Sequence, residues 1–188
     1  VVVTMIARVC RSKGVLEFAA AADCLRGQDK RFRLILVGPE DGGAWDRLTA
    51  AELDRVRGAV TWLGERNDVA AVLAASSICV LPTYYREGIP RALIEAASMG
   101  LPLVATDMPG CREIVRPGVN GHLVAKHDLE SLVGAIRKLA GNEDEARRYG
   151  AASREIAVSE FDISVIAREI GDVYRRCVKP ANHANPHE

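Results

Sequence analysis

Two glutamates, Glu87 and Glu95, are the residues best placed for chemistry, because a predicted turn and helix start lie between them. Gly88 permits close approach of the backbone to a ligand, Pro90 suits the first turn of a helix, and Gly100 is a residue that commonly follows a helix end. With about 1.5 Å of rise per helical residue, we expect the two carboxylates roughly 12 Å apart along the helix axis. One ligand with a hydroxylated group at each end and phosphates between them could contact both.

The helix that carries Glu95 is predicted to follow a strand. Residues 77–81 form a short apolar run closed by Pro82, which is typical of a buried strand. The helix N-terminus, with its free N–H groups, is therefore predicted to point out from the carboxyl end of a strand, and this geometry favours an anion such as a diphosphate. The alternative is that Glu87 is only a favourable charge near the helix start and Glu95 a solvated helix residue. Because Glu95 stands within an apolar run, we expect it to have a partner or a ligand.

Two cations follow the first predicted strand. Arg8 leaves that strand at its carboxyl end, and Lys13 stands five residues later, just before Gly14 and the first helix. Arginine can hold a phosphate through two parallel hydrogen bonds, and lysine supplies a point charge. The alternative is that both are ordinary solvated charges of a surface loop. Arg11, between them, is the weaker candidate.

Composition limits the possible classes of protein. The 188 residues are 48% hydrophobic, enough for one domain with a substantial core, and 25 Lys and Arg balance 25 Asp and Glu. This neutrality gives no support for binding to nucleic acid. No apolar run has the length of a membrane span, and no signal peptide is visible. Five cysteines without paired spacing predict reduced thiols in a cytoplasmic protein, and no cluster of His, Cys and carboxylates has metal-site spacing.

Strands and helices alternate along the chain. The pattern predicts strands at residues 1–7, 31–37, 60–63, 77–81, 103–106 and 121–124. It predicts helices at residues 15–25, 44–57, 68–75, 87–99, 129–140, 143–158 and 163–178, with Asn67 capping the third and a disordered tail at residues 179–188. This order predicts a doubly wound α/β fold, in which a parallel sheet is covered by helices on both faces. Ligands of such folds bind outside the carboxyl ends of the strands, where five candidate residues fall: Arg8, Gly38, Glu65, Glu87 and Asp107.

Two phosphate-binding motifs are absent from the sequence. No G-x-G-x-x-G follows the first strand, which disfavours a nicotinamide or flavin dehydrogenase, and no G-x-x-x-x-G-K-[ST] indicates a phosphate-loop NTPase. A response-regulator-like domain is also disfavoured by the E-x7-E run of Glu87 and Glu95.

Five motifs in order resemble the nucleotide-sugar-binding domain of the family 4 (group 1) glycosyltransferases of the GT-B fold. The resemblance covers residues 1–178, which we expect to form the C-terminal, donor-binding half of such an enzyme. Its motifs are Arg8-x4-Lys13-Gly14, the run 34–38, the run 60–64, Glu87-Gly88-Ile89-Pro90 to Glu95, and the segment 100–121 with Arg112-Glu113. Ala7 departs from the family, which usually has glycine before the arginine, and we expect a slightly tighter fit there.

The resemblance implies a role for each candidate residue. Arg8 and Lys13 would hold the diphosphate of the donor and stabilise its charge as the sugar leaves, and Glu87 would contact the transferred sugar, so these three are the predicted catalytic residues. Glu95 would bind the ribose hydroxyls. The remaining predicted donor-binding residues are Gly38 after the second strand, Glu65 and Arg66 near the base, and the backbone at Gly88, Ile89 and Arg91.

The reaction implied by the resemblance is the transfer of a sugar from a UDP-sugar, with a GDP-sugar as the other candidate, with retention at the anomeric carbon and without a metal or cofactor. The N-terminal acceptor domain of the family is missing here, so we expect this domain alone to be inactive. The implied acceptor is a glycan or polyprenyl-linked lipid of bacterial lipopolysaccharide or polysaccharide synthesis, at the inner face of the plasma membrane, where the enzyme would associate peripherally. A nucleotide-sugar-binding module without transferase activity is the alternative. A sister enzyme of the GT-B fold, a phosphorylase or a nucleotide-sugar epimerase, is also open, although a phosphorylase would need a lysine that carries pyridoxal phosphate, and none can be identified.

The last predicted helix, residues 163–178, carries an apolar stripe. Two arrangements are open: the helix reaches back to the missing half, which leaves the stripe partly exposed here, or the stripe packs on its own domain. The stripe consists of Ile163, Ile166, Ile170, Val173 and Tyr174.

Overall fold

The computed structural model describes residues 1–43 and 45–178 and contains one six-stranded sheet. All paired strands are parallel, and their order is β3-β2-β1-β4-β5-β6. The strands are β1 (Val2–Ile6), β2 (Arg33–Val37), β3 (Thr61–Trp62), β4 (Ile78–Leu81), β5 (Leu103–Thr106) and β6 (Gly121–Val124). The predicted doubly wound α/β fold is confirmed.

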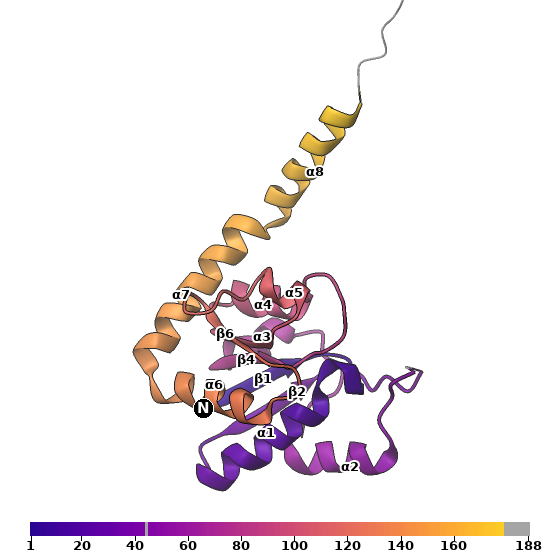
Figure 1. The fold of residues 1–188 in the computed structure, drawn as a ribbon, viewed down its shortest axis with the longest axis vertical. Helices are drawn as coiled ribbons and strands as arrows, with labels where there is room; N and C mark the ends of the chain where they lie inside the picture. The colour runs from indigo at the N-terminus through magenta and orange to yellow at the C-terminus, as the bar shows by residue number, and fades with distance from the viewer. Residues whose placement is uncertain (44, 179–188) are drawn as a thin grey trace, which may run out of the picture.

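Helices cover both faces of the sheet (Figure 1). α1, α2 and α6 pack together on one face, and α4 packs with α7 on the other. The helices are α1 (Val15–Gln28), α2 (Ala50–Ala59), α3 (Val69–Ala74), α4 (Arg91–Ser98), α5 (Pro109–Arg112), α6 (Leu129–Gly141), α7 (Glu143–Glu160) and α8 (Ile163–Cys177), with a 3-10 turn η1 (Arg11–Lys13).

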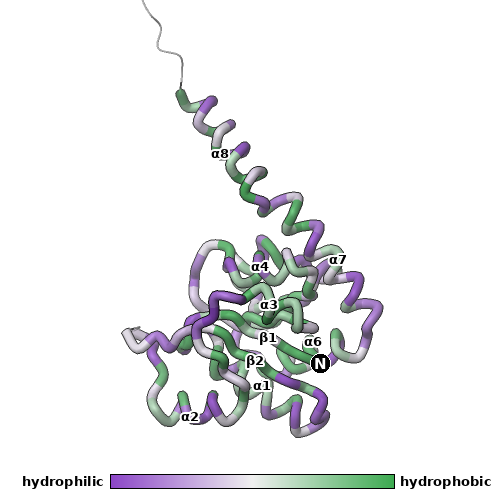
Figure 2. Tube along the Cα trace, turned by 180° about the vertical axis from the view of Figure 1, so that it is seen from behind, coloured by the Kyte–Doolittle hydropathy of each residue, from purple (hydrophilic) through white to green (hydrophobic). Residues whose placement is uncertain are grey.

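The apolar core lies on the two faces of the sheet. All four residues of β4 and all four of β5 are buried, and the central strands are hydrophobic along their length (Figure 2). Parallel strands that are covered on both faces read as continuous apolar runs, which is why residues 77–81 and 103–106 could be predicted as strands.

Three helix starts differ from the prediction. α2 begins at Ala50 rather than residue 44, because Thr49 and Glu52 form a capping box there. Asp68, not Asn67, stands at the N-cap of α3, and its carboxylate accepts hydrogen bonds from Arg66 instead of capping the helix. Pro90 occupies the N-cap of α4 with ψ 117°, so Glu87 lies in a loop outside the helix. The axial spacing predicted for Glu87 and Glu95 therefore does not apply, since it assumed continuous helix.

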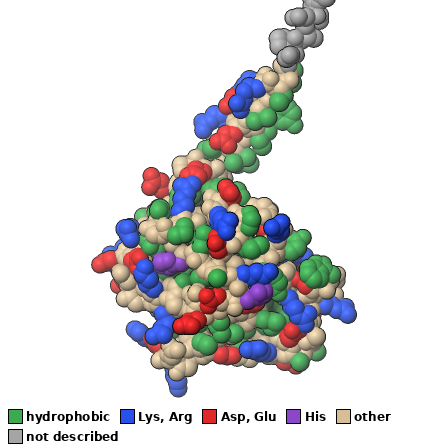
Figure 3. Space-filling view, viewed as in Figure 1, with side chains coloured by type: hydrophobic (Ala, Val, Ile, Leu, Met, Phe, Trp, Pro, Cys, Tyr) green, Lys and Arg blue, Asp and Glu red, His purple; other side chains and the backbone are tan. Residues whose placement is uncertain are grey.

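α8 projects away from the domain (Figures 1 and 2). None of its residues is buried, and apolar side chains line one side of it (Figure 3). Ile163 is 79% exposed and Tyr174 67%. The arrangement in which the stripe packs on its own domain is therefore wrong for this chain.

Two further sequence predictions concern cysteines and membrane spans. All five cysteines are free, as predicted. Within residues 1–43 and 45–178, the helices are too short or too polar to cross a membrane. The tail predicted to be disordered, residues 179–188, lies outside the described residues.

Candidate functional site

The sheet order places a ligand-binding crevice between β1 and β4. These two strands are neighbours at the middle of the sheet, β2 lies beyond β1, and β5 lies beyond β4. The chain therefore leaves them in opposite directions, and ligands of open α/β sheets bind at this switch point, outside the carboxyl ends of the strands. Two loops border the crevice: the β1 loop (residues 7–14) and the β4 loop (residues 82–90).

The β1 and β4 loops are held together through their main chains. The carbonyl oxygen of Ser12 accepts hydrogen bonds from the N–H of Tyr84 at 2.8 Å, the N–H of Tyr85 at 3.1 Å and the hydroxyl of Thr83 at 3.1 Å. Gly14 has φ 79°, and a Cβ there would lie 2.1 Å from the carbonyl oxygen of Pro82. Both its conformation and its contact thus require glycine.

Lys13 and Glu87, predicted on different motifs, meet in this crevice. Lys13 Nζ donates to Glu87 Oε1 at 2.6 Å and lies 5.3 Å from the centre of the Tyr85 ring. The side chain of Lys13 is 11% exposed and that of Glu87 26%. The pair is therefore sheltered, and its Coulomb attraction is stronger than that of a solvated pair.

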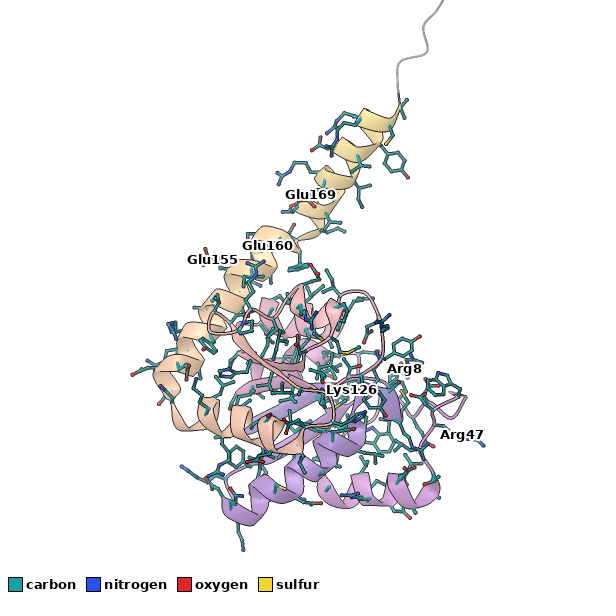
Figure 4. All side chains as sticks on the ribbon, in the orientation of Figure 1. Arg8, Arg47, Lys126, Glu155, Glu160 and Glu169 are labelled. Carbon is teal, nitrogen blue, oxygen red and sulfur yellow. The ribbon has the colours of Figure 1, made fainter. Side chains whose placement is uncertain are left out.

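Arg8 lies at the same edge but is more open to solvent. Its guanidinium donates to the carboxylate of Asp41 in the loop after β2, and its side chain is 56% exposed. Figure 4 shows Arg8 on the side of the domain from which the segment with Arg47 projects. The structure thus brings Lys13 and Glu87 into contact and gives Arg8 a different partner.

The N-terminus of α4 opens toward the crevice without a side-chain cap. Pro90 at the N-cap has no side-chain acceptor, and its carbonyl accepts the first helical hydrogen bonds, from Leu93 at 3.0 Å and Ile94 at 3.3 Å. The N–H groups of Arg91 and the next residue therefore belong to those that a helix leaves without internal partners. They carry the positive end of the helix dipole, as predicted for an anion site.

The two glutamates line different cavities. Glu87 and Gly88 border a cavity of 440 Å³, whose opposite wall is the segment 108–111. Glu95 borders a second cavity of 340 Å³ together with Asn67 and Met99. The side chain of Glu95 is 42% exposed and lies 3.7 Å from Arg91, one helical turn away. Glu95 therefore has the partner that its apolar surroundings suggested, although only a solvated one.

The remaining predicted residues occupy the same edge of the sheet. Gly38 uses both of its main-chain groups within the protein, because its N–H donates to the Gly64 carbonyl at 2.8 Å and its carbonyl accepts from Trp62 Nε1 at 2.9 Å. Glu65 is exposed, and Arg66 is held by Asp68. Ile89 is 37% exposed. Asp107 follows β5 and accepts from Arg112 Nε at 2.5 Å.

Comparison with known proteins now decides the family. The family model for glycosyl transferases group 1 matches residues 1–142. The chain belongs to the group 1 glycosyltransferases. The resemblance noted in the sequence is thus confirmed.

Relatives of this glycosyltransferase chain include named enzymes. It is 33% identical over 180 residues to N,N'-diacetylbacillosaminyl-diphospho-undecaprenol alpha-1,3-N-acetylgalactosaminyltransferase of Campylobacter jejuni, covering 95% of this chain and 45% of that protein. It is 30% identical over 183 residues to alpha-maltose-1-phosphate synthase of Mycobacterium tuberculosis, covering 91% and 46%. Anabaena HepE, solved in complex with UDP, is 25% identical with a TM-score of 0.81, covering 93% and 48%. The chain therefore spans about half the length of the relatives it matches.

Sequence reasoning missed three residues at the site of this glycosyltransferase chain. Cys111 lines the cavity beside Glu87, where burial and then the charge of Glu87 raise the pKa of its thiol to about 12. It is thus a protonated wall residue rather than a nucleophile. Gly110 packs on the main chain of Gly88, and Asp46 contacts the β1 loop. Only Gly110 had a signal, as a glycine beside a proline after β5.

Metal binding depends on how His, Cys, Asp and Glu side chains cluster in the structure. Among residues 1–43 and 45–178, no group of three or more His, Cys, Asp or Glu side chains is arranged to hold a metal ion.

Proposed function

We propose that this chain binds a nucleotide diphosphate sugar and forms the donor half, residues 1–178, of a glycosyltransferase. The observation that carries the proposal is the Lys13–Glu87 pair, which lies beside the uncapped N-terminus of α4 at the switch point of a group 1 glycosyltransferase fold. A phosphate binder, a hydroxyl acceptor and an anion-binding helix end thus share one crevice. Support also comes from Anabaena HepE, which has been solved with UDP and with UDP-glucose.

In this proposal the diphosphate lies against the N–H groups at the start of α4 and the ammonium of Lys13. Negative charge grows on the diphosphate as the bond to the sugar breaks, and these positive groups stabilise it without reorganising. Arg8 adds a second cation from the rim. We propose that the helix dipole and the two cations supply the charge stabilisation, so that the reaction needs no metal or cofactor.

The two glutamates would orient the ends of the donor. The carboxylate of Glu87 accepts hydrogen bonds from hydroxyls of the sugar in the 440 Å³ cavity, and Glu95 accepts those of the ribose. We propose that the sugar is transferred with retention at its anomeric carbon. The nucleotide is UDP, with GDP as the other candidate.

The acceptor would bind to a second domain. The chain matches about half of its relatives' length, and the apolar stripe of α8 is exposed, so we propose that this helix packs on the acceptor domain. The name of the Campylobacter jejuni relative supports a polyprenyl-linked or glycan acceptor, in synthesis of bacterial surface polysaccharide at the inner face of the plasma membrane.

Calorimetric titration of the chain with UDP, GDP and NAD, first without metal and then with magnesium, tests the donor proposal. Binding of UDP or GDP without metal is expected, and the preferred nucleotide identifies the base. Lys13→Ala and Arg8→Ala should each weaken UDP by about 10- to 100-fold, the value of a charge-assisted hydrogen bond, and leave uridine unchanged. Lys30→Ala is the matched control, because Lys30 is exposed in the turn before β2. It therefore lies at the amino ends of the strands, away from the crevice. An equal loss of affinity for UDP and for uridine would show that the two cations do not contact the phosphates.

A nucleotide-sugar-binding module without transferase activity is the second candidate, because the Lys13–Glu87 pair and the start of α4 account for binding of a donor alone. Turnover of a UDP-sugar by the full-length protein distinguishes the two. Binding without turnover would favour the module.

A further inference from the structure

The N–H of Ser12, the residue before Lys13, is held by a buried carboxylate from a distant segment. Asp46 lies 34 residues further along the chain, just before α2, and is 7% exposed. Its Oδ2 accepts the N–H of Ser12 at 2.8 Å, and its carbonyl accepts the N–H of Arg11 at 3.0 Å. Two successive N–H groups of the β1 loop are therefore anchored to one residue.

The next peptide group, which joins Ser12 to Lys13, is held by the β4 loop. The carbonyl of Ser12 accepts the Thr83 hydroxyl and two N–H groups of the following residues. Thr83 is fully buried, and its hydroxyl oxygen also accepts the N–H of Tyr85 at 3.3 Å. Ser12 itself is 5% exposed, so water does not compete for these bonds. Asp46 and Thr83 thus form a clamp on the two successive peptide groups that flank the Cα of Ser12.

Arg11, which directly precedes Ser12, faces away from the crevice. Its guanidinium is bound by Glu52, with Nε 3.1 Å from Oε1, and its Nη1 donates to the Arg47 carbonyl at 2.9 Å. The N–H of Gly14 closes the turn on the Arg11 carbonyl at 2.8 Å. The turn that carries Lys13 is thus fixed at both ends, and Lys13 supplies its free cation to Glu87.

A carboxylate is an unexpected choice close to a site for diphosphate, because like charges repel. Burial alone would raise the pKa of Asp46, but hydrogen bonds from Ser12 and Cys10 lower it overall, so the group stays ionised near neutral pH. An ionised acceptor makes a stronger bond to the Ser12 N–H than a neutral one. The benefit of that bond is a fixed main chain at Lys13.

We propose that Asp46 and Thr83 are positioning residues, which act through the two peptide groups on either side of Ser12 to hold Lys13 beside Glu87 for the diphosphate of the donor. This inference rests on the proposed donor function. It differs from a general role in folding, because it concerns one group of the ligand: loss of the clamp should weaken ligands that carry phosphates and spare the nucleoside.

Titration of the chain with UDP and with uridine tests this inference. Asp46→Ala should weaken UDP by about 10- to 100-fold, as Lys13→Ala does, and change uridine by less than about threefold. Asp46→Asn keeps an amide oxygen that can accept from Ser12, so it should restore UDP affinity to within about tenfold of wild type. Asp54→Ala is the control, because Asp54 is an exposed carboxylate on α2 whose side chain is 76% exposed. The double variant that combines Asp46→Ala with Lys13→Ala should lose no more UDP affinity than Lys13→Ala alone.

Thr83→Val supplies a second test should Asp46→Ala not fold, since it removes a hydroxyl at nearly constant volume. It should weaken UDP by about 3- to 10-fold through the peptide group that joins Ser12 to Lys13, and it should spare uridine. If the Asp46 and Thr83 variants each lose as much affinity for uridine as for UDP, the two residues have a structural role only, and the inference is overturned. Normal UDP affinity in the Asp46 and Thr83 variants, with a loss in Lys13→Ala, would overturn it while the donor proposal stands. No loss in Lys13→Ala would overturn both.

Discussion

Gly110 is the residue whose replacement tests the geometry of the site most directly. It lies in α5, and a Cβ at this position would be 2.0 Å from the carbonyl oxygen of Gly88 and 2.8 Å from that of Glu87. Both neighbours are main-chain atoms and cannot rotate away. To reach ordinary contact the two segments must separate by about 1.4 Å in Gly110→Ala.

This displacement acts on the loop that carries Glu87. Overpacking of this kind costs about 1–3 kcal/mol of the free energy of unfolding. A misplacement of about 1 Å at a reacting group can also cost up to about 100-fold in activity. Because Glu87 is proposed to contact the sugar, Gly110→Ala should weaken UDP-glucose more than UDP. The largest effect is expected on the ratio of the two affinities.

Urea unfolding followed by circular dichroism, and calorimetric titration with UDP and UDP-glucose, measure both effects. Gly134→Ala is the matched control, because a Cβ at Gly134 in α6 meets no atom within 4 Å. It should leave both ligands unchanged and raise stability by up to about 1 kcal/mol. Unchanged stability in Gly110→Ala would mean that the packing is looser than described. Reduced stability with an unchanged ratio of affinities would refute the link between this contact and Glu87.

Three further predictions follow from single groups. Glu95→Ala should weaken UDP and uridine alike, by about tenfold, with little change in urea unfolding; unchanged uridine binding would refute the ribose role. Thr49→Ala removes the α2 cap and should lower the free energy of unfolding by about 0.5–2 kcal/mol, and a change below that range would show that the cap contributes little. Burial, then Lys138, lowers the pKa of His122 below 6.5, so protonation favours the unfolded state. The free energy of unfolding of the wild type should therefore fall as the pH drops below 6.5. The stability difference between wild type and His122→Gln, measured by urea unfolding, should be smaller at pH 5.5 than at pH 7.5, and an equal difference at the two pH values would contradict this.

The strands and most helices could be predicted because local sequence decides them. β4 and β5 are short apolar runs, and α6 to α8 follow the apolar period of a helix. The predicted start of α2 was wrong, because the residues before it were interpreted as part of a continuous helix. Its capping signal, Thr49 followed by Glu52, is nevertheless present in the sequence. α5 was missed because four residues are too few to show a period.

The site could be predicted only in part, for a related reason. Lys13 and Glu87 belong to motifs whose residue types suggest chemistry, and the parallel sheet brings the ends of β1 and β4 to one edge. Asp46 gave no such signal, since its contact with Ser12 joins segments 34 positions apart and depends on the path of an irregular loop. Gly110 is similar, because the sequence shows a glycine at this position but does not show that the Gly88 carbonyl leaves no space for a side chain.

These contacts explain how an irregular loop can hold a side chain, here that of Glu87, in a defined position. The β4 loop has no helix or strand to hold it, yet main-chain contacts fix it at its start, centre and end. Gly14 packs on Pro82, the Ser12 carbonyl accepts three hydrogen bonds from the next residues, and Gly110 packs on Gly88. Glu87 lies between the second and third contacts. Its position therefore depends on residues without reactive groups, so changes at these contacts should act on the sugar and diphosphate while the sheet and its core remain intact.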